Sequence, residues 1–421
     1  MRAEPFFGPD FTLLQRQDPE MAQILLDELE RASGGLQLIA SENFTSPAVM
    51  AALGSTLTNK YAEGYPGRRY YGGCEVVDRA ERLAIDRARR LFAAEHANVQ
   101  PHSGASANLA AYAALLQPGD TMLAMALPHG GHLTHGSKVN FSGRWFDVVS
   151  YGVRRDTEQI DYDEVRDLAL RNQPKVIVCG ATAYPRLIDF SAFRGIADEV
   201  GAWLLADVAH TIGLMAGGAI PSAVPYADVV TFTTHKALRG PRGGGILCTA
   251  ELAARVDRAV FPFVQGGPLM HAIAAKAVAF AEAAAPEFAG YTQRVVANAK
   301  ALCDSLAAEG MRPVSGGTDS HLALIDLRAI EVTGAEAEKR CAAAGITLNR
   351  NAIPYDPEPA SITSGLRVGT PCVTTQGMGP EQLKEVGTLV AQAIRYPENA
   401  AEVQERVSGM VAIHKPYLSE Y

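Results

Sequence analysis

Cysteine is scarce in this chain, and its scarcity excludes one class of protein at the outset. Six cysteines occur in 421 residues, and they are scattered without the paired spacing of a disulfide framework or a zinc site. We therefore expect reduced thiols in a cytoplasmic protein that binds no metal. The six residues are Cys74, Cys179, Cys248, Cys303, Cys341 and Cys372.

Basic runs and long apolar runs are also missing. No run of five or more basic residues occurs, and the net charge of −8 with a pI near 5.7 argues against a general nucleic-acid binder. Gly, Asp or His interrupts each long apolar stretch before the roughly 20 residues that a membrane helix needs. The first residues carry acids and prolines but no apolar signal core. We expect no nucleic-acid partner, no membrane segment and no secretion.

The chain is long enough for more than one compact unit. With 421 residues and 48% hydrophobic content, two domains are the natural expectation. A helical pattern within residues 10–32, started by Asp18 and Pro19, predicts an interface helix. We predict an N-terminal arm over residues 1–35, a large domain over 36–285 and a small C-terminal α/β domain over 286–421.

Strands and helices alternate through the middle of the chain. Apolar strands are predicted at 121–127, 147–153, 176–180, 203–210 and 228–236, with helices over 161–171 and 191–200. Such near-continuous apolar strands indicate an α/β fold whose mostly parallel sheet is covered by helices on both faces. Because ligands bind beyond the carboxyl ends of parallel strands, Asp207, His210, His235 and Lys236 should face one crevice.

The segment DVVTFTTHKALRGPRGGGILC, residues 228–248, places a lysine where an apolar strand ends. A buried ammonium without a partner costs several kcal/mol or has a lowered pKa. An imine between Lys236 and an aldehyde cofactor would compensate that cost. Taken alone, Lys236 is explained as well by a side chain that reaches solvent.

Other residues favour pyridoxal 5'-phosphate as that cofactor. A carboxylate such as Asp207 keeps a pyridine nitrogen protonated, and the small-residue turn from Ser103 to Ser106 opens a helix whose free amides suit a phosphate. Each feature has a structural alternative, because Asp207 could cap a turn and Ser103 an ordinary helix.

Three histidines at intervals of three, His129, His132 and His135, could suggest a metal site. No carboxylate or cysteine accompanies them, so we interpret them instead as supplying a histidine that stacks on a flat ligand. Arg367, flanked by small residues, is a candidate clamp for a substrate carboxylate, although a surface ion pair explains it equally well.

Long motifs then identify a family. The segments NKYAEGYPGRRYYGG, NVQPHSG, HGGHLTHG, DVAHTIGL, TTHKALRGPRGG, QGGPLMH, VSGGTDSH and TSGLRVGTP resemble those of serine hydroxymethyltransferase, in the same order and across nearly the whole chain. The resemblance implies fold type I of the pyridoxal phosphate enzymes, in a homodimer or dimer of dimers whose active sites lie at the subunit interface. The implied reaction transfers the hydroxymethyl carbon of serine reversibly to tetrahydrofolate and gives glycine and 5,10-methylenetetrahydrofolate.

The resemblance also implies roles for individual residues. Lys236 corresponds to the residue that holds the cofactor covalently, and the catalytic group further includes Glu63, His235 and Tyr71. The expected cofactor contacts are Asp207, His210, His132, Ser103, Gly104, Ala105, Thr182, Thr233 and, from the neighbouring subunit, Tyr61, Gly266 and Gly267. The expected substrate contacts are Ser41, Glu63, Tyr71 and Arg367. The expected folate contacts are Leu127, Gly131, Leu133 and Asn349.

Five positions depart from the usual family sequence: Thr182, Ser106, Pro128, Phe232 and Phe263. Phe263 adds apolar bulk on the folate side of the interface, and we expect it to narrow the folate channel. Two alternatives follow. One is a paralogue acting on an altered amino acid, such as an α-methylserine hydroxymethyltransferase or a folate-independent β-hydroxy-amino-acid aldolase or transaldolase. The other is a regulatory protein that binds the cofactor without turnover.

Overall fold

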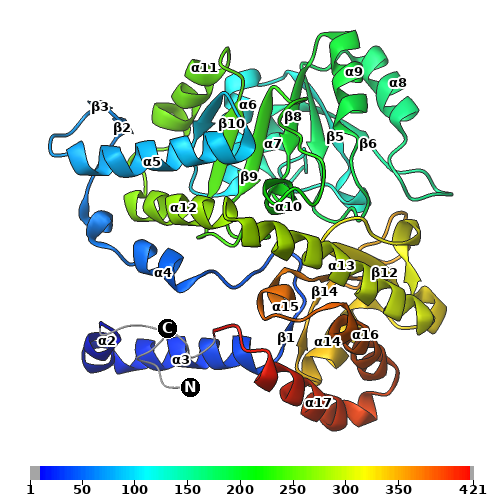
Figure 1. The fold of residues 1–421 in the computed structure, drawn as a ribbon. Helices are drawn as coiled ribbons and strands as arrows, with labels where there is room; N and C mark the ends of the chain where they lie inside the picture. Colours follow the sequence, from blue (N-terminus) through cyan, green and yellow to red (C-terminus); the bar gives the residue numbers. More distant parts are fainter. Residues whose placement is uncertain (1–9, 418–421) are drawn as a thin grey trace.

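A seven-stranded sheet forms the centre of the molecule in a computed structural model that describes residues 10–417 (Figure 1). The strands β9, β8, β7, β5 and β6 are parallel, and β10 pairs antiparallel with both β9 and β4. This arrangement confirms the predicted α/β class with a mostly parallel sheet. In spatial order the strands are β4 (His96–Asn98), β10 (Gly244–Cys248), β9 (Val229–Thr233), β8 (Trp203–Asp207), β7 (Val176–Gly180), β5 (Thr121–Met125) and β6 (Asp147–Tyr151).

Helices cover both faces of this sheet, which explains why its strands are almost entirely apolar. Alternate residues point to opposite faces, so Leu123 and Met125 join one core cluster while Met122 and Ala124 join another. The first cluster contains residues of α5 (Glu75–Phe92), α8 (Tyr162–Asn172), α9 (Phe190–Val200), α10 (Ile212–Ala216) and α12 (Met270–Ala283). The second contains residues of α6 (Gly104–Leu115), α11 (Ala253–Arg258) and η3 (Ala259–Val264), and α7 (Phe141–Trp145) packs against it.

A second core surrounds a four-stranded sheet in the C-terminal part of the chain. The strand order is β11 (Arg312–Pro313), β12 (Leu322–Asp326), β15 (Gly365–Gly369) and β14 (Asn349–Asn351). Its helices are α13 (Pro286–Ala308), α14 (Gly334–Ala343), α15 (Pro371–Thr375), α16 (Pro380–Arg395) and α17 (Ala400–Ile413). Leu36 and Leu38 also belong to this core, because β1 (Leu36–Gln37) pairs in parallel with β13 (Ile346–Thr347). The division of the chain after residues 35 and 285 stays a prediction.

The N-terminal segment is helical where the structure describes it. Helices α2 (Phe11–Gln17) and α3 (Pro19–Gly34) are followed by α4 (Pro47–Leu53), the 3-10 turn η1 (Thr56–Asn59) and a hairpin of β2 (Gly64–Tyr65) and β3 (Arg68–Arg69). The Asp18 carboxylate caps α3 by accepting a hydrogen bond from the Met21 amide at 3.0 Å, as its place before Pro19 predicted. Residues 1–9 of the predicted arm lie outside the described part. No helix of residues 10–417 is long and apolar enough to span a bilayer.

Several strands are shorter than the sequence predicted. β8 ends at Asp207 instead of residue 210, and β9 ends at Thr233 instead of residue 236. The chain turns after both strands, since the Thr211 amide donates to Val208 O and the Arg239 amide donates to Lys236 O. His210 and Lys236 therefore lie in the loops beyond the strands. The apolar segment at 345–349 divides between β13 and β14, which belong to different sheets.

Candidate active site

Lys236 lies in the loop that follows β9 and is 9% exposed. Asn43 Nδ2 donates to its carbonyl oxygen at 3.1 Å and thereby fixes the backbone. Within residues 10–417 no carboxylate forms an ion pair with the amine. Burial, opposed by the charge of Asp207 and aided by those of Arg367 and Arg242, lowers the pKa of Lys236 to about 8. A larger fraction of this amine is consequently neutral and nucleophilic near pH 7 than of an exposed lysine.

Asp207 ends the neighbouring strand β8, and three donors hold its carboxylate. His135 Nε2 lies 2.9 Å and Asn108 Nδ2 2.8 Å from Oδ2, and the Ala209 amide donates to Oδ1 at 3.1 Å. Burial opposes ionisation, but the hydrogen bonds from His135 and Asn108 keep the pKa of Asp207 well below its usual value. The carboxylate is thus a fixed negative charge with one acceptor position still free, since it offers about four.

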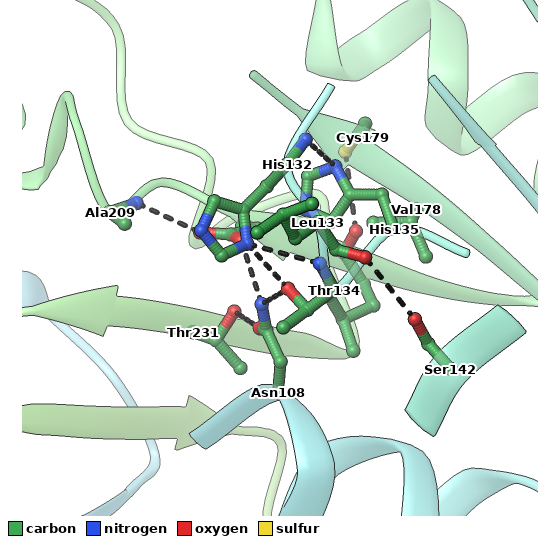
Figure 2. A network of polar contacts seen from close by, with 12 residues as sticks. Asn108, His132, Leu133, Thr134, His135, Ser142, Val178, Cys179, Ala209 and Thr231 are labelled. Carbon is green, nitrogen blue, oxygen red and sulfur yellow. Dashed lines mark hydrogen bonds and ion pairs between the residues drawn. The ribbon is translucent and has the colours of Figure 1, made fainter. Parts of the chain in front are cut away.

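The side chains around Asp207 are themselves held in place (Figure 2). Asn108 Nδ2 also donates to Thr134 Oγ1 at 2.7 Å, and its Oδ1 accepts from Thr231 Oγ1 at 2.6 Å. The Nδ1 atom of His135 accepts the His132 amide at 3.2 Å, so Nε2 carries the hydrogen that is donated to the carboxylate. All polar atoms of Asn108 are therefore occupied, and its orientation follows from its neighbours.

The three histidines of the 129–135 segment have different partners. His129 Nδ1 accepts the Val153 amide at 3.1 Å, whereas His132 Nδ1 lies 2.8 Å from Thr134 Oγ1. Burial lowers the pKa of His132, the charge of Asp207 opposes this effect, and the ring lies 5.9 Å from that of His135. Among the described residues no group of His, Cys, Asp and Glu is suited to a metal ion. Stacking of His132 on a ligand ring stays a prediction.

The small-residue turn opens α6 as predicted. Ser103 is the N-cap, and its Oγ accepts the Ser106 amide at 3.1 Å. Gly104 is needed at the first helical position, because a Cβ there would approach Thr233 Cγ2 to 2.7 Å. Thr233 Oγ1 in turn donates to Ala209 O at 3.0 Å. The start of α6, which includes Ala105, thus lies against the end of β9 and presents free backbone amides that suit an anion.

Arg367 reaches this region from β15 of the second core. Its Nη1 donates to Thr182 O at 3.0 Å and its Nε to Asn349 Oδ1 at 3.3 Å. Burial lowers the pKa of Arg367 to about 10, and its charge in turn lowers the pKa of Lys236. Two of its five N–H donors are used in these contacts, so the outer face of the guanidinium is able to bind a carboxylate.

Two further histidines form a buried pair beside this site. His210 Nδ1 lies 3.1 Å from His321 Nε2, and the rings stack with centroids 5.3 Å apart. Burial lowers the pKa of both residues, and the charges of Lys236 and Arg367 add to the effect.

His235 and Ser41 line a groove that is also bordered by Arg242 and Tyr417. His235 Nε2 lies 3.2 Å from Arg242 Nη1. Burial, with Arg242 and Lys236 next, lowers the pKa of His235 to about 3. A neutral imidazole at this position accepts the guanidinium hydrogen bond.

Glu63 lies in a separate cluster near the β2–β3 hairpin. Tyr61 Oη donates to its Oε1 at 3.3 Å, and the Tyr61 and Tyr71 rings meet edge to face at 5.2 Å. A Cβ on Gly266 would lie 3.2 Å from Glu63 Oε1, and one on Gly267 3.0 Å from the Tyr61 ring. No hydrogen bond or ion pair of the described residues joins this cluster to Lys236. Tyr61 and Tyr71 are about half exposed.

The expected folate residues lie in two places. Leu127, Gly131 and Leu133 follow β5, where both leucines are 47% exposed and Gly131 packs so closely on Met125 O that a Cβ would approach it to 2.2 Å. Asn349 lies on β14, where its Oδ1 accepts a hydrogen bond from Arg367 Nε. Phe263 is 69% exposed.

Phe232, in contrast, lies in the core. It packs against the rings of Phe92 and Phe280, and Gly245 makes room for it opposite on β10. The Phe232 side chain, one of the departures from the family sequence, therefore lies in the core and away from the loops that hold Lys236.

Sequence reasoning missed four polar residues that hold the site: Asn108, Thr231, His321 and Lys276. Asn108 and Lys276 stand out in retrospect, because Asn108 is the one side-chain amide of α6 and Lys276 the one lysine of α12, and both helices are Ala-rich and apolar. His135 was noticed for its spacing, but its bond to Asp207 follows only from the tertiary structure. Nothing local distinguishes Thr231 within its apolar strand.

These residues fit pyridoxal 5'-phosphate. The buried amine of Lys236 suits the aldehyde, the ionised Asp207 suits a protonated ring nitrogen, and the free amides at the start of α6 suit the phosphate. A mostly parallel α/β sheet with these groups beyond adjacent strand ends defines the class of the fold type I pyridoxal phosphate enzymes.

Comparison with known proteins identifies the family within this class. The family model described as serine hydroxymethyltransferase matches residues 14–390. A serine hydroxymethyltransferase of Rippkaea orientalis is 59% identical over 380 residues, which cover 90% of this chain and 89% of the relative. Those of a Nostoc and a Synechococcus species are 56% and 57% identical, and each comparison covers 92% or more of both chains. The chain belongs to the serine hydroxymethyltransferase family.

Proposed function

We propose that this protein is a pyridoxal phosphate-dependent serine hydroxymethyltransferase. It transfers the hydroxymethyl carbon of L-serine reversibly to tetrahydrofolate and gives glycine and 5,10-methylenetetrahydrofolate. The observation that carries the proposal is the buried, unpaired amine of Lys236 beside the ionised carboxylate of Asp207, within a chain that matches the family over residues 14–390.

The cofactor would be held at three points. Lys236 would bind its aldehyde covalently, Asp207 its ring nitrogen, and the amides of Ser103, Gly104 and Ala105 its phosphate. When bound, the cofactor supplies an electron-accepting ring that stabilises the electrons left on the glycine carbon when the hydroxymethyl group departs. Asp207 keeps the proton on the ring nitrogen because the carboxylate itself is held ionised by His135 and Asn108.

Further contacts to the cofactor are proposed for the side chains around it. His132 would lie over the ring, His210 near its phenolic oxygen together with Thr182, and Thr233 near the phosphate. The buried pair that His210 forms with His321 supports a fixed orientation of that imidazole.

Arg367 would bind the carboxylate of serine and set the orientation of the bond that breaks. Its Nη1 and Nε contacts to Thr182 O and Asn349 Oδ1 hold the guanidinium, so that little freedom remains to be lost on binding. Ser41 and Tyr71 would add contacts to the substrate. Leu127, Gly131, Leu133 and Asn349 would bind the folate.

Glu63 is the group proposed to move the proton of the serine hydroxyl, with His235 and Tyr71 as further catalytic groups. Because Glu63 and Tyr61 form their own cluster beside Gly266, we propose that they act in the site of a second copy, in a homodimer or dimer of dimers. The half-exposed rings of Tyr61 and Tyr71 support burial against a partner. We also propose a cytoplasmic location, which six free, buried cysteines support.

The experiment that tests this function compares L-serine, α-methylserine and allo-threonine as substrates, each with and without tetrahydrofolate. We expect L-serine to be the preferred substrate and its cleavage to depend on the folate. A preference for α-methylserine, or cleavage of L-serine that ignores the folate, would contradict the proposal. The amount of pyridoxal phosphate bound per chain, measured on the same preparation, separates a missing cofactor from a different substrate.

A further inference from the structure

Lys276 is a buried lysine to which the proposed reaction gives no role. It lies within the Ala-rich helix α12, which packs against α5 and α4 on one side of the large sheet (Figure 1). Its side chain is 2% exposed, and its Nζ donates to three backbone carbonyls: Val99 O at 2.7 Å, Pro101 O at 2.9 Å and Gly244 O at 2.8 Å.

The geometry of these contacts indicates the charged form. An ammonium has three donors and no acceptor, and three carbonyl oxygens at hydrogen-bond distance match it in number and kind. A neutral amine would turn a lone pair toward one of the oxygens. Burial lowers the pKa of Lys276 to about 7, and the negative charge of Glu81 opposes that effect. No carboxylate of residues 10–417 forms an ion pair with Lys276, so the carbonyls alone solvate the charge.

Two of the three carbonyls, those of Val99 and Pro101, belong to the turn that leads into the start of α6. This segment, residues 99–103, connects β4 to α6 and lies outside the helices and strands. Lys276 binds Val99 O and Pro101 O, and Gln265 binds Gln100 O and the His102 amide. Lys276 and Gln265 thus bind three consecutive carbonyls of the turn and stabilise its conformation.

The third carbonyl, Gly244 O, belongs to a residue that packs against Ser103 and Gly104. The Gly244 amide donates to Pro101 O at 3.1 Å, and a Cβ on Gly244 would lie 2.4 Å from Ser103 O and 3.0 Å from the Gly104 nitrogen. Gly243 packs closely against Lys276, since a Cβ added at Gly243 would lie 2.5 Å from Lys276 Cε. Only one glycine of β10 therefore separates the ammonium from the amides that face the anion.

We propose that Lys276 is a positioning residue for the phosphate of the cofactor. It fixes the 99–103 turn so that the Ser103 and Gly104 amides point into one place, and it adds a buried positive charge behind them. A dianion bound in front of the turn would compensate the charge that the carbonyls leave uncancelled. This inference rests on the proposed function, because it takes pyridoxal 5'-phosphate as the ligand.

The test separates the phosphate from the rest of the cofactor. The full-length chain, freed of cofactor, is titrated with pyridoxal 5'-phosphate and with pyridoxal. The dissociation constant of pyridoxal divided by that of pyridoxal 5'-phosphate measures the contribution of the phosphate. We expect Lys276→Met to reduce this ratio about tenfold or more, because a charge and the order of two amides are lost together. Inorganic phosphate should raise the melting temperature of the unsubstituted apoprotein and raise that of the variant less.

Lys300→Met is the matched control, since Lys300 lies on the exposed face of α13 and pairs only with Asp304. It should leave the ratio unchanged within about twofold. Lys276→Gln keeps two N–H donors without the charge and should give an intermediate ratio.

The outcomes are distinguishable. If Lys276→Met weakens pyridoxal and pyridoxal phosphate equally, the lysine only supports the fold and the positioning role is wrong. Failure of both Lys276 variants to fold would assign the residue to the core and overturn the inference in the same way. If the unsubstituted chain binds neither ligand, the proposed function itself fails.

Discussion

Replacement of Asp207 by Asn is the substitution whose consequence follows most directly from the structure. The carboxylate accepts three hydrogen bonds, from His135 and Asn108 at Oδ2 and from the Ala209 amide at Oδ1. An amide has one acceptor oxygen and one donor nitrogen. If its oxygen occupies the Oδ2 position, the NH2 group faces the Ala209 N–H. In the opposite orientation it faces two donors, so at least one hydrogen bond is lost in either case.

The size of the effect can be worked out from this count. A buried hydrogen bond to a charged acceptor contributes about 1.5–3 kcal/mol. For a chain of this length we expect the melting temperature of the apoprotein to fall by about 2–3 °C, since the entropy of unfolding rises with chain length. The neutral amide also ceases to hold the proton on the ring nitrogen, and we expect kcat with L-serine to fall about 100-fold or more.

Three measurements check this prediction: the melting temperature, the cofactor bound per chain, and kcat with L-serine and tetrahydrofolate. Asp198→Asn is the matched control, because Asp198 is exposed and pairs with Arg194 on the surface of α9. It should leave all three quantities nearly unchanged. A kcat for Asp207→Asn within about threefold of the unsubstituted chain would refute the role given to the carboxylate.

The other predictions concern groups beside Asp207. Lys236→Ala should purify without covalently held cofactor and lose multiple turnover, and normal turnover would exclude its role. Glu63→Gln should strongly lower the rate of serine cleavage while the absorbance of the bound cofactor stays normal. An unchanged folate-dependent rate would contradict the proton-transfer role of Glu63. Arg367→Lys loses the planar fork, so KM for serine should rise about tenfold or more, and an unchanged KM would contradict the clamp. Burial, with the charges of Lys236 and Arg367 next, lowers the pKa of His321 to about 3. Its stabilising contribution is therefore complete above about pH 6.5 and is lost as the pH falls. Between about pH 7 and pH 5 the free energy of unfolding should therefore fall by about 2 kcal/mol less in His321→Gln than in the unsubstituted chain. Equal losses in the two chains would contradict the buried neutral state.

The strands of the large sheet could be predicted because their residues are apolar on both faces. The segment 176–180 is β7 without change, and the helix predicted over 161–171 is α8 within one residue at each end. The strand ends were less accurate, since Val208 and Thr234 are suited to a strand and leave it only because of the turns that follow. Period and composition predict the middle of an element, whereas tertiary contacts decide where it stops.

The sequence by itself determined the chemical inventory and the mostly parallel α/β sheet beyond whose strands it lies. A lysine and an aspartate beyond consecutive strand ends must lie at one edge, because parallel neighbours share their direction. The tertiary structure alone decided which side chains hold these groups. His135 and Asn108 bind Asp207, Lys276 braces the turn before α6, and Arg367 meets Thr182 from the other core. These partners are far apart in the chain, and the pairing of distant residues depends on three-dimensional packing, which no local pattern encodes.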